Sequence, residues 1–147
     1  MNHTPQILLV EDNPNDAELT IRALKKNNFS QALTHVKDGQ EALDFLFGVG
    51  AYAERDIKEQ PKVVLLDLKL PKVHGIEVLR QIRANPDTKL LPVVVLTSSR
   101  EDSDLVNAYN LGVNSYIVKP VDYEKFTEAV TQLGIYWTLL NEIPLEK

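Results

Sequence analysis

The chain has 147 residues, a formal net charge of -5 at neutral pH, 44% hydrophobic residues and 25% charged residues. This length and composition predict one soluble globular domain. The acidic balance provides no basic surface for nucleic acid, no apolar run approaches the length of a membrane span, and the absence of cysteine excludes disulfides and thiolate metal sites. Because the first residues also lack the pattern of a signal peptide, we expect a cytoplasmic protein.

Five short apolar runs recur along the chain, and each is followed by the apolar periodicity of an amphipathic helix. Aliphatic runs of this kind predict strands that are buried on both faces. Their alternation with helices predicts an α/β domain with a parallel sheet, helices on both faces and right-handed crossovers. The predicted strands are residues 7–10, 33–36, 63–67, 92–96 and 115–118.

Local signals place the intervening helices. Asn13 is suited to cap the first helix, Pro14 suits its first position, and Asp16 favours the positive end of the helix dipole. This helix is predicted to end near residue 27, and residues 48–60 predict a polar surface loop, either irregular or with a helical extension. The apolar positions of the next three helices are Ala42, Leu43, Phe45 and Leu46, then Ile76, Leu79 and Ile82, then Leu105, Ala108, Tyr109 and Leu111.

Chemically active residue types stand at the ends of four of the predicted strands. Because the carboxyl ends of parallel strands meet at one edge of a sheet, we expect these side chains to collect there. Three carboxylates in one place repel one another, which predicts a hard divalent cation between them, Mg²⁺ with Mn²⁺ or Ca²⁺ as substitutes. The residues are Glu11 and Asp12, Asp67, Thr97 and Lys119.

This set of side chains suits the transfer of a phosphoryl group. Lys119 offers a compact positive charge for phosphate oxygens, and Thr97 offers a hydroxyl donor. Asp67 stands alone on the central strand, so we expect it to be the nucleophile. Each residue taken singly has a simpler explanation, as a helix-starting loop, a cap or a solvated charge. Their occurrence in order at four strand ends is what indicates a site.

Two other functions compete with this interpretation. A phosphatase of the haloacid-dehalogenase kind needs a second Asp two positions after the first, where this chain has Lys69. A flavodoxin-like electron carrier needs a loop rich in Ser and Thr after the first strand, whereas Glu11 and Asp12 would repel a phosphate there. Bound flavin, catalytic turnover and the uptake of one phosphoryl group distinguish the three functions.

Four ordered motifs surround the strand ends: Val10-Glu11-Asp12-Asn13, Leu65-Leu66-Asp67-Leu68-Lys69-Leu70-Pro71 with Gly75, Val95-Leu96-Thr97-Ser98 and Tyr116-Ile117-Val118-Lys119-Pro120. With them the chain resembles the receiver domain of the two-component response regulators over nearly its whole length. The resemblance implies a doubly wound, flavodoxin-like (CheY-like) sheet in the order 2-1-3-4-5. It also implies a signalling protein that is not an enzyme for other substrates, with a sensor histidine kinase as its partner.

The same resemblance assigns roles to individual residues. Asp67 is implied to be the phosphoacceptor, and Lys119 to contact the phosphoryl group. The magnesium ligands are implied to be Glu11, Asp12, Asp67 and the backbone carbonyl of Lys69. Thr97 and Tyr116 resemble the switch pair of the family.

The C-terminal part carries a narrower resemblance. A long last helix is predicted from near Asp122 past Trp137, and the residues from 132 to 144 resemble the tail of small response regulators paired with bacterial phytochrome kinases. This implies one receiver domain over 1–147, a C-terminal extension over 134–147 and a function in light signalling. A phosphorelay intermediate or phosphate sink for another histidine kinase is the alternative, and the output is a contact with a downstream protein.

The tail also predicts a homodimer. Apolar residues from Phe126 to Leu140 have the spacing of a helix-pairing seam. The apolar residues that lie beyond the expected end of a receiver's last helix would form an exposed apolar patch if no partner covered them. Some of them are aromatic, and aromatic residues are common interface anchors. The alternative is a tail that folds back on its own domain. The predicted interface residues are Ile135, Tyr136, Trp137 and Leu140.

Overall fold

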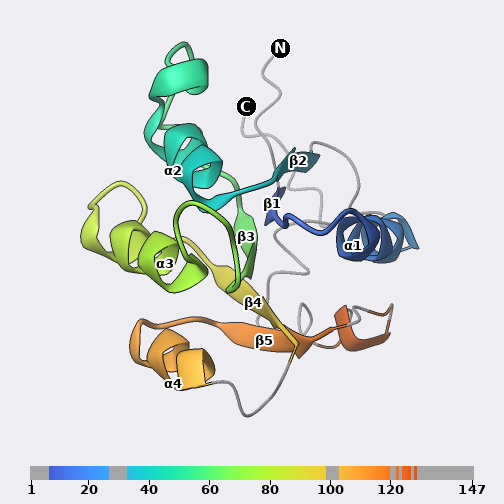
Figure 1. Ribbon diagram of the computed structural model, residues 1–147. Helices are drawn as coiled ribbons and strands as arrows, with labels where there is room; N and C mark the ends of the chain where they lie inside the picture. Colours follow the sequence, from blue (N-terminus) through green and yellow to red (C-terminus); the bar gives the residue numbers. More distant parts are fainter. Residues whose placement is uncertain are drawn as a thin grey trace, which may run out of the picture.

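The computed structural model describes residues 7–26, 33–98, 103–119, 122, 124–126 and 128. Its centre is a five-stranded parallel sheet in the order β2-β1-β3-β4-β5 (Figure 1). This confirms the doubly wound fold and the strand order that the sequence predicts. The strands are β1 (Ile7–Val10), β2 (Leu33–Val36), β3 (Val63–Asp67), β4 (Val93–Thr97) and β5 (Ser115–Val118).

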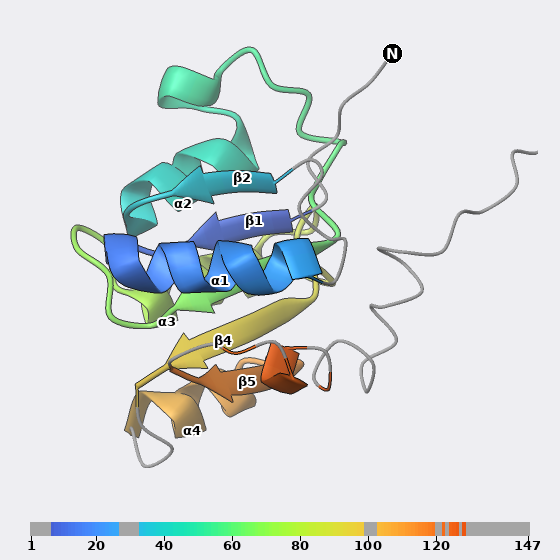
Figure 2. The ribbon, with the colours of Figure 1, turned by 90° about the vertical axis from the view of Figure 1, so that its right-hand side faces the viewer.

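Helices cover both faces of the sheet. Three of them lie on one face, while α1 and the helical residues 124–126 lie on the other (Figures 1 and 2). The expected cap of α1 is formed, because Asn13 Oδ1 accepts hydrogen bonds from two backbone N–H groups of that helix. The structure also shows a cap on α2, where Asp38 Oδ1 accepts a hydrogen bond from Glu41 N at 2.7 Å. The helices are α1 (Pro14–Lys26), α2 (Gly39–Phe47), the 3₁₀ helix η1 (Gly50–Tyr52), α3 (Gly75–Ala84) and α4 (Ser103–Asn110).

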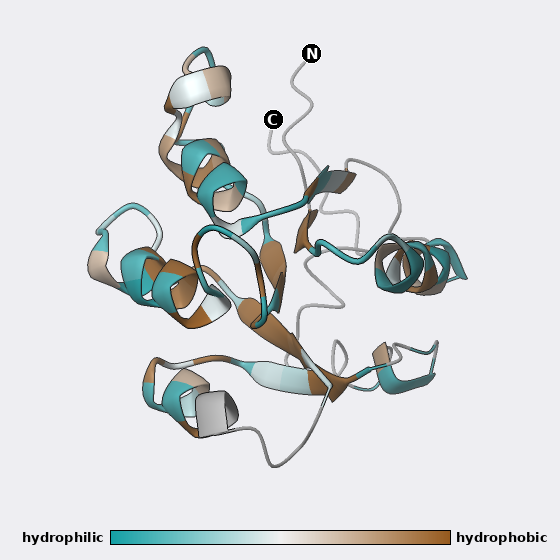
Figure 3. Cartoon of the chain, in the orientation of Figure 1, coloured by the Kyte–Doolittle hydropathy of each residue, from teal (hydrophilic) through white to brown (hydrophobic). Residues whose placement is uncertain are grey.

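The strands divide the interior into two apolar cores. Successive strand side chains point to opposite faces, so Leu8 and Leu66 join the core under α2 and α3, while Leu9 and Leu65 join the core under α1. In Figure 3 the central strands β1, β3 and β4 are mostly apolar, and the helices on both sides carry polar as well as apolar residues. A sheet buried on both faces is rigid, and it therefore holds its strand ends in constant positions.

The polar segment after α2 is ordered by contacts with that helix. The Arg55 guanidinium lies 4.0 Å from the centroid of the Phe45 ring and donates a hydrogen bond to the Phe45 carbonyl. Gln60 Nε2 donates to the Leu46 carbonyl at 2.9 Å. The predicted surface loop over 48–60 is thus an extension of the C-terminal end of α2 that includes η1.

The start of the last predicted helix is described, but most of the tail is not. Asp122 Oδ1 accepts a hydrogen bond from Lys125 N at 2.7 Å, and Phe126 is buried in the core under α1. The predicted extension over 134–147, with the interface residues Ile135, Tyr136, Trp137 and Leu140, lies outside the described residues. Among the helices that the structure describes, none is both long and apolar enough to span a membrane.

Candidate functional site

Two neighbouring strands bring three carboxylates to the carboxyl edge of the sheet. Val10 of β1 pairs with Leu66 of β3, so Glu11 and Asp67 leave the sheet side by side. Carboxylate oxygens of Glu11, Asp12 and Asp67 all lie within 4.8 Å of one another. Glu11 and Asp67 are buried, whereas Asp12 is exposed. The cluster therefore has one open side, at Asp12.

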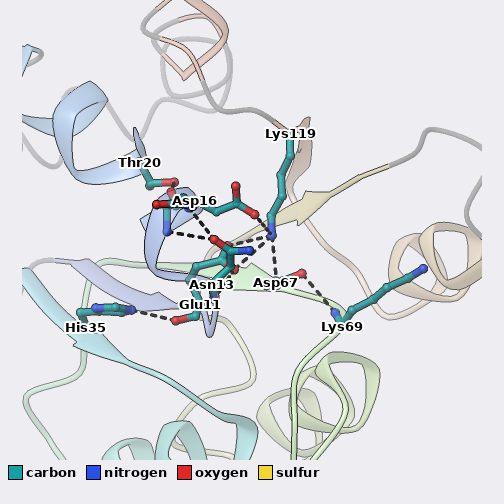
Figure 4. A network of polar contacts seen from close by, with 9 residues as sticks. Glu11, Asn13, Asp16, Thr20, His35, Asp67, Lys69 and Lys119 are labelled. Atoms are coloured by element: carbon teal, nitrogen blue, oxygen red, sulfur yellow. Dashed lines mark hydrogen bonds and ion pairs between the residues drawn. The ribbon is translucent and has the colours of Figure 1, made fainter. Parts of the chain in front are cut away.

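Lys119, which follows β5, reaches into this cluster. Its Nζ donates hydrogen bonds to Glu11 Oε2 at 3.1 Å, Asp16 Oδ2 at 3.0 Å and Asp67 Oδ2 at 3.1 Å (Figure 4). Its backbone N–H donates to the Thr97 carbonyl at 2.7 Å, which ties the end of β5 to the end of β4. The structure thus brings the predicted lysine and carboxylates together in one network.

Asp16 also belongs to this network, and it is not among the site residues that the sequence predicts. Its sequence position indicated only a favourable charge in the first turn of a helix. That turn follows β1, so it lies at the same edge of the sheet as the other acids. The spacing between Asp12 and Asp16, one helical turn, could therefore have predicted that Asp16 lies at the site.

The site holds groups with strongly shifted proton affinities. Burial, with the neighbouring Asp67 carboxylate, raises the pKa of Glu11 to about 7, although the hydrogen bond from Lys119 opposes this shift. Burial alone lowers the pKa of Lys119, but its hydrogen bond to Glu11 and the charge of Asp67 outweigh this and raise it. Lys119 is consequently a stable ammonium. Any further cation nearby would stabilise the charged form of Glu11.

The oxygen donors present suit a hard divalent cation. Glu11 Oε1 is buried and, among the described residues, accepts no hydrogen bond, although it lies 2.9 Å from Lys119 Nζ. The exposed carboxylate of Asp12 and that of Asp67 complete a set of ligands that Mg²⁺ prefers. The backbone N–H of Lys69 donates to Asp67 Oδ1 at 3.1 Å, which fixes the carboxylate plane. A bound Mg²⁺ would offset the negative charge that otherwise repels an anionic phosphate donor.

Gly75 is required by the turn that follows Asp67. Its backbone N–H donates to the Leu68 carbonyl at 2.9 Å, and a Cβ there would lie 2.5 Å from the Asp67 carbonyl oxygen. Two histidines lie nearby. His74 Nδ1 accepts a hydrogen bond from a backbone N–H in the first turn of α3, and His35 Nε2 lies 2.8 Å from the Glu11 carbonyl oxygen. Both histidines are bound to the backbone around the site.

The two predicted switch residues lie on adjacent strands. Thr97 is buried at the end of β4, and Tyr116 is half-buried on β5. The Tyr116 ring meets the ring of Tyr109 edge to face, with their centroids 6.0 Å apart. Tyr109 was predicted to line the apolar side of its helix, but it is 49% exposed. Its contact with Tyr116 links α4 to β5.

Comparisons with known proteins agree with this site. Residues 7–131 match the response regulator receiver domain family. Response regulator Rcp1 of Synechocystis sp. is 39% identical over 94% of this chain and 92% of its own length. A methanogenesis regulatory protein, FilR2 of Methanothrix harundinacea, described as probable, is 43% identical over 94% of this chain and 86% of its own.

Solved structures show the same relationship. The bacteriophytochrome response regulator RtBRR superposes with a TM-score of 0.84 and 51% identity, covering 94% of this chain and 82% of that chain. The Mn²⁺-bound form of Rcp1 superposes with a TM-score of 0.72 and 37% identity, covering 96% of this chain and 98% of that chain. The acidic cluster, the lysine at the end of β5 and the family match lead to one conclusion: the chain belongs to the receiver domains of the response regulators.

Proposed function

We propose that this protein accepts a phosphoryl group on Asp67 from the phosphohistidine of a sensor histidine kinase. The observation that supports this most directly is the Lys119 ammonium, 3.1 Å from Asp67 Oδ2 within a cluster that suits Mg²⁺. In the transfer, an Asp67 oxygen attacks phosphorus and the phosphorus–nitrogen bond breaks. The electron pair stays on the imidazole nitrogen, which takes up a proton. Lys119 stabilises the charge on the phosphoryl oxygens, and Thr97 can donate its hydroxyl to one of them. A Mg²⁺ held by Glu11, Asp12 and Asp67 would supply further positive charge there.

Incubation with acetyl phosphate tests this function without the kinase. We expect the intact mass to rise by one phosphoryl group in the presence of Mg²⁺, since the cation offsets the repulsion between the carboxylates and the anionic donor. Chelation of the cation is expected to stop the reaction, and a bound Mg²⁺ is expected to raise the melting temperature. A mass gain that proceeds equally well after chelation would contradict the role of the acidic cluster.

We propose that the cognate kinase is a bacteriophytochrome, so that the protein works in light signalling in the cytoplasm. The support is the similarity to RtBRR, a bacteriophytochrome response regulator. The second candidate is a phosphorelay intermediate or phosphate sink for another histidine kinase, because FilR2, which is also similar to this chain, is named as a methanogenesis regulatory protein and not as a phytochrome response regulator. Phosphotransfer from a panel of autophosphorylated kinases distinguishes the two, because the cognate kinase transfers fastest. In both cases the output is a contact with a downstream protein.

Thr97 and Tyr116 are proposed to carry the signal from Asp67 to α4. We expect phosphorylation to shift the NMR signals of Tyr109 and Tyr116, because Thr97 moves toward the phosphoryl group and Tyr116 moves with it. In Thr97→Ala the signals that shift should be only those of residues around Asp67. The coupling free energy between phosphorylation of Asp67 and the position of Tyr116 should fall by about 1–3 kcal/mol. Thr34→Ala, on the edge strand β2, is the matched control. Unchanged distant shifts in Thr97→Ala would contradict this switch.

The tail is proposed to hold a homodimer through Ile135, Tyr136, Trp137 and Leu140. We expect the full chain to sediment as a dimer, with Trp137→Ala and Leu140→Ala together weakening it at least tenfold, since buried aromatic anchors contribute about 2 kcal/mol or more. Leu90→Ala is the control, because Leu90 is 86% exposed on the loop after α3. A wild-type monomer at micromolar concentration would overturn the proposal.

A further inference from the structure

Asp16 has a contact that the receiver chemistry must change. An ammonium has three N–H donors, and Lys119 Nζ uses them on Glu11, Asp16 and Asp67 (Figure 4). A phosphoryl oxygen that arrives at Asp67 needs one of these donors. One carboxylate must therefore give up its hydrogen bond when the phosphoryl group is transferred.

Burial indicates which carboxylate gives up the contact. The Glu11 side chain is fully buried and that of Asp67 is 7% exposed, whereas that of Asp16 is 29% exposed. A carboxylate that loses its partner must regain hydrogen bonds from water, and the least buried one does this at the lowest cost. Asp16 is therefore the partner that Lys119 exchanges most easily for a phosphoryl oxygen.

The Asp16 carboxylate is also separable from the fold of α1. The backbone N–H of Asp16 donates to Asn13 Oδ1 at 3.0 Å, and its carbonyl accepts a hydrogen bond from Thr20 Oγ1 at 2.9 Å. These contacts involve only the backbone of Asp16. Its carboxylate is directed at Lys119, so a neutral side chain of the same shape should leave the helix start in place.

We infer that Asp16 is a positioning residue that acts through Lys119 and limits how readily Asp67 is phosphorylated. Between transfers it holds the ammonium, and during transfer it yields that contact to a phosphoryl oxygen. Its charge also adds to the repulsion of an anionic donor. Both effects slow phosphorylation, so Asp16 lowers the rate at which Asp67 is phosphorylated. This inference rests on the proposed phosphorylation of Asp67.

The test compares Asp16→Asn with the wild-type full chain. The reaction is with acetyl phosphate, in which an Asp67 oxygen bonds to phosphorus and acetate leaves with the electron pair of the broken bond. At saturating Mg²⁺, the initial rate of mass gain should rise about three- to fivefold in Asp16→Asn, the effect of one partly exposed ion pair. Asp16→Glu, which keeps the charge, should stay near the wild-type rate.

A matched control and an NMR signal separate this role from a structural one. Glu18→Gln, on the same helix, removes a carboxylate that pairs with Arg22 and should leave the rate unchanged. The Lys119 Nζ signal should move in Asp16→Asn and stay in Glu18→Gln. An Asp16→Asn rate equal to or below that of the wild type overturns the inference while the proposed function stands. A wild-type protein that gains no phosphoryl group overturns both.

Discussion

Asp67→Asn is expected to lose phosphorylation by acetyl phosphate and by any kinase. The amide has the size and shape of the carboxylate but is a far poorer nucleophile, so the rate should fall by at least about 10³-fold, as is common when a nucleophile is removed. The measurement is the intact mass over time at saturating Mg²⁺. The fold should persist, because the amide oxygen can still accept the hydrogen bond that Lys69 N now makes to Oδ1, and Lys119 keeps its hydrogen bonds to Glu11 and Asp16.

Asp87→Asn provides the matched control for this variant. Asp87 is exposed on the loop between α3 and β4, at the opposite edge of the sheet from the site. The control protein should gain one phosphoryl group at the wild-type rate. If Asp67→Asn gained a phosphoryl group as fast as Asp87→Asn, another residue would be the acceptor and the assignment of Asp67 would be wrong.

Lys119→Ala is expected to affect both stability and rate. Without Mg²⁺, Glu11 and Asp67 would face each other in a buried site with no cation, and removal of one partner of a buried ion pair costs about 3–5 kcal/mol in the free energy of unfolding. Mg²⁺ should recover part of this loss, because it replaces the missing charge. The phosphorylation rate should fall about 10²-fold, as for other lost groups that stabilise transition-state charge.

Urea unfolding with and without Mg²⁺ measures the first effect, and intact mass measures the second. Lys89→Ala is the control, because Lys89 is an exposed lysine on the loop before β4. A Lys119→Ala protein as stable as Lys89→Ala in the absence of Mg²⁺ would show that the three carboxylates do not need the ammonium. An unchanged rate would exclude Lys119 from the transfer.

The sheet and the edge where its strands end could be predicted from local patterns. An aliphatic run such as Val63–Leu66 is stable only when both faces are covered, and alternation with helices makes the sheet parallel. All carboxyl ends then share one edge, so Glu11, Asp67 and Lys119 had to lie near one another wherever the helices packed. The strand order followed from the resemblance to the receiver family, whereas the register of the strands came from the structure.

The partner of Asp16 and the surroundings of Tyr116 were decided only by the tertiary structure. A side chain in the first turn of α1 meets Lys119 only if the helix has one particular rotation over the sheet. That rotation is set by the packing of distant residues such as Leu24 and Phe126 in the core under α1. In the same way, Tyr109 fits an apolar helix stripe by spacing, but in the structure it is 49% exposed and its ring lies against Tyr116. Strand ends are placed by the hydrogen-bonded ladder, whereas helix faces are placed by side-chain packing between segments far apart in the chain.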